Sequence, residues 1–321
     1  MPFDVVIPAH NNAATISRVL IRLRPQCADG DRGVIVDDGS TDATADVIER
    51  TVASWRDRVA LVRQPQRGPA AARNAAVKLG TNHLLLFLGA DIVPDATLLS
   101  RHRAVHTWYP ESTVGCLGFV TWDSSLPPTP FMVWLEHGGN QNAYGEIAGK
   151  TWVDPRAYCY CANLSVKREF LEDAGGFDEE HFRSYGWEDL DLGIRLARRG
   201  CRLCYEPTAR ARHVHAHTVS SIVQRQRQLG TGAVILERLH PDSVRFPPKQ
   251  RGWLLRICRR LLYALGTSGW FVWLVGFFGR RFILPRMYEF LLSSSFKKSV
   301  QGSREPHRSV EKDYKGILRL F

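Results

Sequence analysis

The chain has 321 residues, of which 44% are hydrophobic and 23% charged, a composition that suits one large globular domain with a smaller attachment. Its formal net charge of +11 comes from one end, because residues 1–244 hold 27 Lys and Arg against 28 Asp and Glu, whereas residues 245–321 hold 16 against 4. No nucleic-acid recognition motif accompanies the basic end, so the composition argues against a nucleic-acid partner.

The first predicted element is a short strand in residues 4–12, DVVIPAHNN, which ends near Pro8. A helix is predicted to begin at Thr15, since the apolar residues that follow it recur at helical spacing on one face: Ile16, Val19, Leu20 and Leu23. Pro8 and Ala9 are therefore predicted to lie at the end of a strand.

The second predicted strand, in residues 34–42, reads VIVDDGSTD and runs directly into two carboxylates. A buried strand of β-branched residues is typical of a parallel sheet, and α/β proteins bind ligands at the carboxyl edge of such a sheet. Asp37 and Asp38 are therefore predicted to lie at the mouth of a ligand crevice. The alternative is a plain turn in which Asp42 caps the next helix, and it accounts for the small residues there.

Two further segments continue this pattern. Residues 67–76, RGPAAARNAA, open a predicted helix whose small residues allow close packing on a sheet, and Arg73 within it is a residue type suited to a diphosphate. Residues 84–94, LLLFLGADIVP, predict a buried strand followed by Gly-Ala-Asp, which places Asp91 at the sheet edge.

Acids and histidines follow in the second half of the chain. Residues 175–192, GGFDEEHFRSYGWEDLDL, predict an aromatic turn and then a helix that opens with Glu188, Asp189 and Asp191. The helix dipole favours acids in a first turn, and this is the alternative to a functional role, but it leaves Trp187 unexplained.

Residues 212–217, RHVHAH, carry His213, His215 and His217 at alternate positions, which share one face of an extended segment. This spacing suggests a metal ligand, and a polar strand end without a ligand is the alternative.

Taken in order, the segments VDDGSTD, ARNAA, LGAD, GGFDE and GWED make the chain resemble glycosyltransferase family 2, whose members are inverting enzymes with the GT-A fold. The resemblance runs from about residue 3 to about residue 240. It implies an α/β catalytic domain in residues 1–244, with a Rossmann-like mixed sheet flanked by helices. A helical extension is expected in residues 245–321.

The resemblance also implies roles for residues of the predicted crevice. Pro8, Ala9 and Asn11 would line the nucleotide pocket of a nucleotide-sugar donor, Asp38 would accept a hydrogen bond from uracil, and Arg73 would reach the diphosphate. The expected donor is therefore a UDP-sugar.

A metal site is implied as well. Asp91 matches the last acid of the family's Asp-x-Asp motif and would bind Mg²⁺ or Mn²⁺, with a histidine, His213 first and His215 second, completing the site. Gly89 stands where the first acid is expected. Hard divalent cations are often held by one or two carboxylates plus substrate phosphates, so activity is still expected.

For the chemistry, the resemblance points to Asp189 as the base that removes the proton of the acceptor hydroxyl, with Glu188 contacting the acceptor or the donor sugar. Trp187 would offer an aromatic plate for a sugar. The acceptor should be chosen by residues 114–165, where core packing explains most aromatic side chains. Within them Tyr158–Ser165 is predicted to be a strand, and Asn163 is predicted to help hold the acceptor loop.

The basic C-terminal part has a pattern of its own. An uncharged stretch, residues 261–278, is bracketed by arginine pairs and is followed by a second predicted helix in residues 283–296. This mixture favours peripheral contact of residues 254–298 with an anionic membrane surface. A helical subdomain packed on the catalytic domain, or a homodimer interface, is the alternative.

Seven cysteines, an odd number, and a strand that begins by residue 4 favour a reduced, cytoplasmic protein without a signal peptide, at the inner face of the membrane if the tail binds lipid. Two functions remain open. The leading one is an inverting, metal-dependent glycosyltransferase with a saccharide, lipid-linked or secondary-metabolite acceptor. The second, suggested by Gly89, is a degenerate GT-A domain that binds a nucleotide-sugar or a partner without catalysis.

Overall fold

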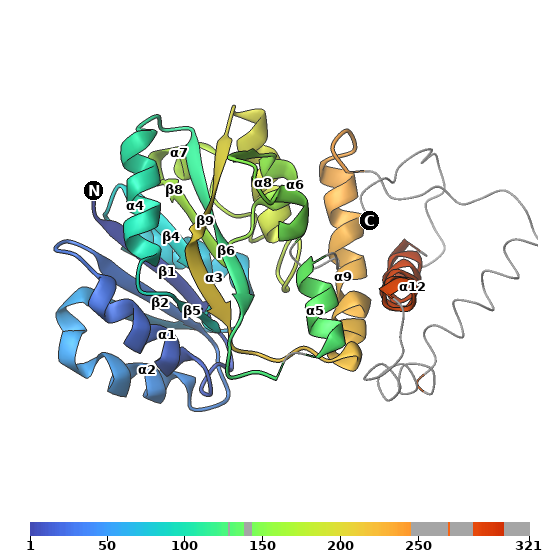
Figure 1. Cartoon of the computed structure of the whole chain (residues 1–321), viewed down its shortest axis with the longest axis horizontal. Coiled ribbons are helices and arrows are strands. Elements are labelled where there is room, and N and C mark those ends of the chain that lie inside the picture. The colour runs from blue at the N-terminus through green and yellow to red at the C-terminus, as the bar shows by residue number, and fades with distance from the viewer. Residues whose placement is uncertain (128, 138–142, 245–268, 270–284, 305–321) are drawn as a thin grey trace, which may run out of the picture. The chain divides into compact units, whose positions relative to one another are not determined.

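A computed structural model of the chain describes residues 1–127, 129–137, 143–244, 269 and 285–304 (Figure 1). The chain divides into two compact units. The first comprises Met1–Pro127 and Glu146–His215, and the second comprises Pro128–Gly145 and Ala216–Phe321. The predicted boundary at residue 244 stays a prediction.

The first unit contains a mixed sheet of nine strands within the described residues, in the order β3-β2-β1-β4-β8-β6-β9-β5, with β7 beside β9. The strands are β1 (Phe3–Ala9), β2 (Arg32–Asp38), β3 (Val59–Gln64), β4 (Leu84–Leu88), β5 (Ile92–Pro94), β6 (Val114–Trp122), β7 (Trp152–Val153), β8 (Asn163–Lys167) and β9 (Arg202–His213). The first four strands run parallel, whereas β8 is antiparallel to β4 and β6. All five residues of β4 are buried, as expected for a parallel strand covered on both faces.

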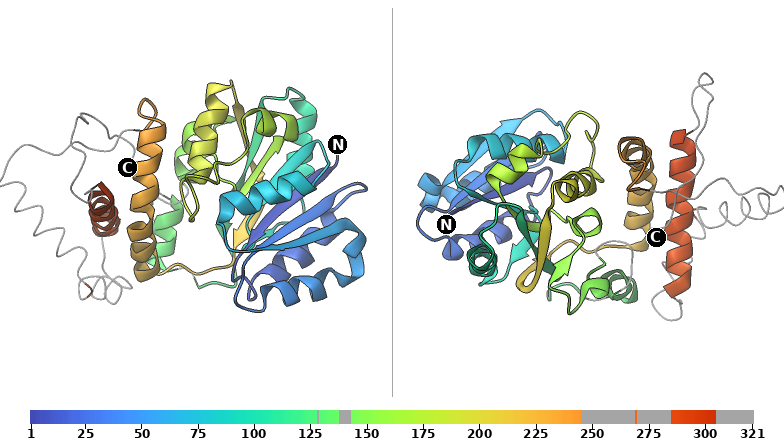
Figure 2. Two further views of the ribbon diagram at one scale, coloured as in Figure 1. Left: turned by 180° about the vertical axis from the view of Figure 1, so that it is seen from behind. Right: turned by 90° about the horizontal axis from the view of Figure 1, so that it is seen from above.

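The helices of the first unit are α1 (Ile16–Leu23), α2 (Thr44–Val52), α3 (Pro69–Leu79), α4 (Leu98–Trp108), α6 (Pro155–Tyr158), α7 (Arg168–Asp173) and α8 (Glu188–Arg198), with short 3₁₀ turns η1 (Arg24–Gln26) and η2 (Ala53–Arg58). All four apolar residues predicted for the inner face of α1 are buried. The connections through α1 and α2 lead toward β3, whereas α3 leads back across the sheet to β4. Right-handed crossovers therefore put α1 and α2 on one face and α3 on the other, as Figures 1 and 2 show.

The predicted strand Tyr158–Ser165 is only partly correct. Pro155 and Asp154 start a short helix instead, since the Asp154 side chain accepts a hydrogen bond from Arg156 N, and this helix ends at Tyr158. The strand β8 begins at Asn163. Local capping by Asp154 and Pro155 thus outweighs the apolar pattern of the segment.

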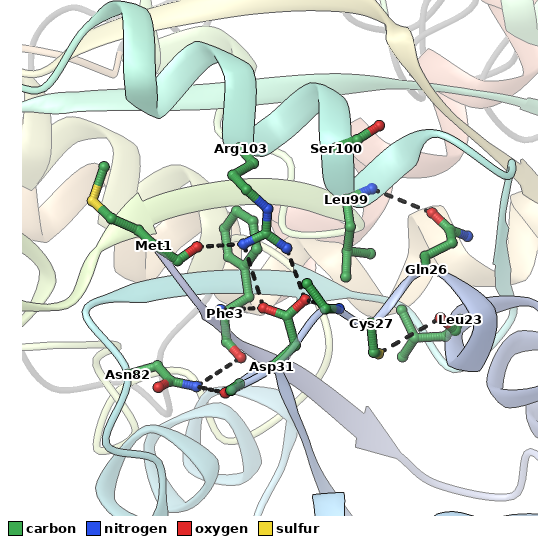
Figure 3. Close-up of polar contacts among 12 residues, drawn as sticks. Met1, Phe3, Leu23, Gln26, Cys27, Asp31, Asn82, Leu99, Ser100 and Arg103 are labelled. Atoms are coloured by element: carbon green, nitrogen blue, oxygen red, sulfur yellow. Dashed lines mark hydrogen bonds and ion pairs between the residues drawn. The ribbon is translucent and has the colours of Figure 1, made fainter.

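The amino edge of the parallel strands is closed by a buried acid (Figure 3). Asp31 Oδ1 accepts a hydrogen bond from Phe3 N at 2.7 Å, and Oδ2 accepts from Ala28 N at 2.8 Å and from Arg103 Nη2 at 2.7 Å. The guanidinium of Arg103 also lies over the Phe3 ring, 5.1 Å from its centroid. These contacts join α4 to β1 and to the loop before β2.

The second unit contains α5 (Pro130–His137), α9 (Val219–Leu239) and α12 (Pro285–Arg304), while η3 (Tyr144–Ile147) spans the boundary between the units. Thr218 and Ser221 form a capping box at the start of α9. Gly230 of α9 lies against α12, because a Cβ there would be 2.1 Å from Ser299 Oγ. The backbones of α9 and α12 therefore approach closely.

Much of the predicted C-terminal pattern lies outside the described residues, including the apolar stretch 261–278 except residue 269. The second predicted helix corresponds to α12, which begins at Pro285 and extends to Arg304. Within the part of the chain that the structure describes, no helix combines the length and the apolar character needed to span a membrane. Peripheral membrane contact, a homodimer and a cytoplasmic location stay predictions.

Candidate active site

The carboxyl ends of β1 and β2 meet at one corner of the sheet. Ala9 pairs with Asp37 in their parallel register, so Pro8 and Ala9 lie at a strand end, as predicted. Asn11, in the loop after β1, has a φ of 54°, and its Oδ1 accepts a hydrogen bond from Thr41 N at 2.9 Å. That side chain joins the loops after β1 and β2 and thereby shapes the corner.

Asp38, the last residue of β2, is buried and holds the start of α3. Its Oδ1 accepts hydrogen bonds from Gln64 Nε2 at 2.6 Å and Arg67 N at 2.9 Å, and its Oδ2 accepts one from Gly68 N at 2.8 Å. Gly68 has a φ of 94°, and a Cβ there would lie 2.2 Å from Arg183 O, so this turn requires glycine. Because a carboxylate has about four acceptor sites, these three donors leave about one, on Oδ2.

Asp91 and His213, far apart in the sequence, meet at the carboxyl side of β4. The pairing of β5 with β9 sets Ile92 opposite His213, and His213 Nε2 lies 3.3 Å from Asp91 Oδ2. The other ring nitrogen, Nδ1, is 3.0 Å from His215 O. When Nδ1–H donates along this contact, Nε2 carries the lone pair that a metal ion needs.

These two side chains fit a divalent cation that takes its remaining ligands from a substrate. A carboxylate oxygen and an imidazole nitrogen are both ligands that Mn²⁺ accepts, and the Asp91 side chain is 32% exposed. Among the described residues there is no group of three or more His, Cys, Asp or Glu side chains that could hold a metal. A cation at Asp91 and His213 would therefore depend on additional ligands such as phosphate oxygens.

Gly89 is fixed in its place by packing. Its N–H donates to Ala162 O at 3.3 Å. A Cβ at this position would lie 2.6 Å from Ile92 Cγ1 and 3.0 Å from Asp91 Oδ1. An acid could therefore not be restored at this position by substitution of Gly89 alone, because any side chain here would force Ile92 to move.

Helices α3 and α8 bring Arg73, Glu188 and Asp189 into one cluster. Arg73 Nη1 lies 3.0 Å from Glu188 Oε1 and 3.3 Å from Asp189 Oδ1. Glu188 is buried, and its Oε2 accepts a hydrogen bond from Gly186 N at 2.8 Å. Burial and then the charge of Asp189 raise the pKa of Glu188, while Arg73 opposes both.

Asp189 is the more open of the two acids. Its side chain is 28% exposed, and its Oδ2 accepts a hydrogen bond from Cys161 N at 2.9 Å. Asp191 differs, because it pairs with Arg195 of the same helix at 2.7 Å and is buried. A structural role in α8 therefore explains Asp191.

Backbone strain is concentrated at this edge. Apart from glycines, the described residues with positive φ are Asn11 and Trp187, the latter at 75° directly before Glu188. A bulky residue with positive φ is a genuine outlier, and such outliers cluster at functional sites. Trp187 sets the direction in which α8 starts and so helps to aim Glu188 and Asp189.

Asn163 holds the sheet beneath the site rather than a loop at the surface. It is fully buried, its Nδ2 donates to Ala209 O at 2.8 Å, and its Oδ1 lies 2.9 Å from His102 Nε2. Burial lowers the pKa of His102 to about 4, so its imidazole is neutral at pH 7. The β6–β9 register shifts between Gly118 and Phe119, and Asn163 fills this irregularity.

The groups that support the acidic cluster were not predicted from the sequence. Asn74 clamps the segment before α8, because its Oδ1 accepts from Phe177 N at 2.9 Å and its Nδ2 donates to Phe177 O at 2.8 Å. Asn74 follows Arg73 directly in the sequence, a signal that could have been noticed. The N–H of Cys161 left no signal, because every residue type except proline offers that donor.

Two curated proteins of similar sequence are named as glycosyltransferases. The chain is 30% identical over 250 residues to the pre-mycofactocin glycosyltransferase of Mycobacterium tuberculosis, covering 74% of this chain and 48% of the relative. It is 30% identical over 225 residues to the validoxylamine A glucosyltransferase of Streptomyces hygroscopicus, covering 61% of this chain and 51% of that one. The chain thus spans about half the length of these curated relatives.

Among solved structures, the mannosyltransferase PcManGT of Pyrobaculum calidifontis, in complex with GDP-Man and Mn²⁺, has a TM-score of 0.58 at 19% identity, covering 94% of this chain and 88% of its own. TarS of S. aureus in complex with UDP has a TM-score of 0.51 at 16% identity, covering 99% and 96%. At these identities the likeness establishes the fold alone.

The likeness to these structures gives the chain the GT-A fold. The family model described as glycosyl transferase family 2 matches residues 4–173, and the chain belongs to that family.

Proposed function

We propose that this chain transfers a sugar, with inversion, from a UDP-sugar to a hydroxyl group of a saccharide, lipid-linked or secondary-metabolite acceptor. The observation that carries the proposal is the approach of His213 to Asp91, 3.3 Å apart, at the same carboxyl edge where Asp38 ends β2. The relatives support transfer of a sugar, since both curated relatives named above are glycosyltransferases and PcManGT is a mannosyltransferase.

The hydrogen bonds of Asp38 support uracil as the base. Three donors already occupy its carboxylate, so about one acceptor site is left on Oδ2. Uracil presents one N–H on its pairing edge, between two carbonyl groups, and matches this capacity. Guanine presents two adjacent donors that would require both oxygens. Pro8, Ala9 and Asn11 would shape the pocket around the base.

Asp91 and His213 would hold Mg²⁺ or Mn²⁺ together with the donor's diphosphate. The cation would supply a Lewis acid that neutralises the charge of the leaving group. Because substrate oxygens would complete the coordination of such a cation, a second acid at residue 89 would not be needed.

Asp189 is the proposed base. The acceptor oxygen forms a bond to the anomeric carbon, the bond from that carbon to the diphosphate oxygen breaks, and the hydroxyl proton passes to the carboxylate. Oδ2 suits this role, because the hydrogen bond from Cys161 N uses only one of its lone pairs. Glu188 is more deeply buried, and we propose that it contacts the sugar of the donor or acceptor.

Thermal unfolding with nucleotides tests the donor and metal parts. We expect UDP with MnCl₂ to raise the melting temperature, GDP to raise it less, and EDTA to remove the effect. Asp91→Ala should abolish the metal-dependent shift and His213→Ala should weaken it. His83→Ala, an exposed histidine before β4, is the control.

Stabilisation by UDP that ignores EDTA and both substitutions would refute the metal-dependent mechanism. Release of UDP from a panel of UDP-sugars then separates an enzyme from a degenerate binding domain. Binding without any turnover on candidate acceptors would favour the degenerate domain.

A further inference from the structure

We propose that Arg73 is a positioning residue for the two acids of α8 and not a ligand of the donor's diphosphate. The inference rests on the proposed function, because it assigns a part within the same site. It departs from the role that family resemblance implies for Arg73, and the reason is the direction and the surroundings of its guanidinium.

The guanidinium of Arg73 contacts both acids. A single nitrogen, Nη1, lies within 3.3 Å of both Glu188 Oε1 and Asp189 Oδ1. The residue is 7% exposed, so little of it is open to a ligand. A diphosphate would bring more negative charge to a cation that two carboxylates already share.

Neighbouring aromatic rings and hydrogen bonds hold the guanidinium in this orientation. The Phe177 ring lies over it, 5.3 Å from the guanidinium carbon, and the Phe87 ring meets Phe177 edge-on at 5.2 Å. Asn74, the next residue of α3, ties the Phe177 backbone with two hydrogen bonds. Turning Arg73 toward a donor would require these contacts to break.

Arg73 supplies the positive charge that offsets the two carboxylates of this cluster. Burial alone would lower the pKa of Arg73, but the carboxylates of Asp189 and Glu188 raise it by more, so the guanidinium stays charged. Without that cation two adjacent carboxylates would face each other, and Glu188, whose pKa burial already raises, would be the first to take up a proton. Arg73 therefore favours the ionised form of both acids and holds Asp189 Oδ1 in place.

Calorimetric titration of UDP and UMP in the presence of MnCl₂ tests the assignment. For Arg73→Gln we expect the dissociation constant of UDP to stay within about threefold of the wild-type value. A diphosphate ligand should behave differently, because loss of a hydrogen bond to a charged group costs about 10-fold to 100-fold in affinity. A loss of that size for UDP but not for UMP would overturn the proposal.

The pH dependence of UDP release from the best UDP-sugar substrate gives a second measurement. Removing a cation beside the base makes its ionised form less favourable, so the acid limb of the rate profile should move to higher pH by about one unit or more. Arg73→Lys retains the charge and should move the limb less. An unchanged limb in Arg73→Gln would also overturn the proposal.

Arg195→Gln is the matched control. Arg195 likewise pairs with a buried acid of α8, through Nε and Nη2 to Asp191 Oδ2, but none of its recorded contacts involves Asp189. It should lower stability without moving the acid limb. If Arg73→Gln fails to fold, Arg73→Lys carries the test, with UDP affinity retained and kcat lowered at unchanged KM for the donor.

Failure of the wild-type protein to bind either UDP or GDP would contradict the proposed function. Normal binding by the wild type with loss in Arg73→Lys and Arg73→Gln would contradict only the role of Arg73.

Discussion

The two edges of the parallel sheet treat the same residue type in opposite ways. At the amino edge, Asp4 and Asp31 are fully buried, with Arg168 2.7 Å from Asp4 and Arg103 2.7 Å from Asp31. At the carboxyl edge, Asp91 and Asp189 keep about a third of their side-chain surface exposed. Burial beside an arginine marks these two structural acids and partial exposure marks the candidate metal ligand and the candidate base, whereas Asp38 and Glu188 of the carboxyl edge are buried as well.

The difference follows from what each edge has to do. A buried ion pair is costly to break, so a closed acid fixes the contacts between a helix and the strands. An acid that binds a metal or moves a proton must exchange partners during a reaction cycle and cannot be saturated beforehand. Asn11 and Trp187, with their positive φ, lie in the loops of the carboxyl edge, where strain can serve the site.

The largest expected effect is on stability at the amino edge. Asp31→Ala removes the partner of Arg103 and leaves Phe3 N and Ala28 N without their acceptor. Breaking a buried ion pair costs about 3–5 kcal/mol of unfolding free energy. Urea denaturation measures this loss, and folded protein should bind UDP as the wild type does.

The control for this prediction lies two residues away. Asp29 also pairs with an arginine, Arg58, at 3.0 Å, but its side chain is fully exposed. Asp29→Ala should leave the urea midpoint unchanged. Equal losses of unfolding free energy in the two variants would contradict the distinction between buried and exposed acids.

At the carboxyl edge the expected loss is in rate. Asp189→Asn preserves the shape of the side chain but cannot take a proton, so UDP release should fall by about 10²-fold or more. The urea midpoint should change less than for Asp31→Ala, since Asp189 is partly exposed. Near-normal turnover would move the base to Glu188 or refute the proposal.

The sequence predicted the fold well because the signals of the central strands are local. Buried apolar runs such as Leu84–Leu88, followed by small or acidic residues, define both the strands and the edge where they end. The carboxylates of the site were found for the same reason, since each follows a strand or opens a helix. His213 could be placed beside Asp91 only through family resemblance, because their approach depends on the pairing of β5 with β9.

What escaped prediction depends on the direction of side chains and on the backbone. The sequence around Arg73 suits a diphosphate, and only the packing of α3 against α8 reveals that its guanidinium meets Glu188 and Asp189. The start of β8 was misplaced because Asp154 caps a helix within an apolar segment. Local pattern fixes neither the rotamer of an arginine nor the competition between a cap and a strand.

The smallest expected effect sharpens the comparison at Gly89. A methyl group there would lie 2.6 Å from Ile92 Cγ1 and 3.0 Å from Asp91 Oδ1, so Gly89→Ala should displace Asp91 and weaken Mn²⁺-dependent UDP binding. The expected weakening is a few-fold, about 1 kcal/mol, in line with the usual cost of overpacking. Ile92→Ala removes the clashing atom. The double variant should therefore bind UDP almost as tightly as Ile92→Ala alone, so that Gly89→Ala has little effect in that background. Additive losses in this cycle, measured by calorimetry, would mean that Gly89 acts through its backbone and not through the space beside Asp91.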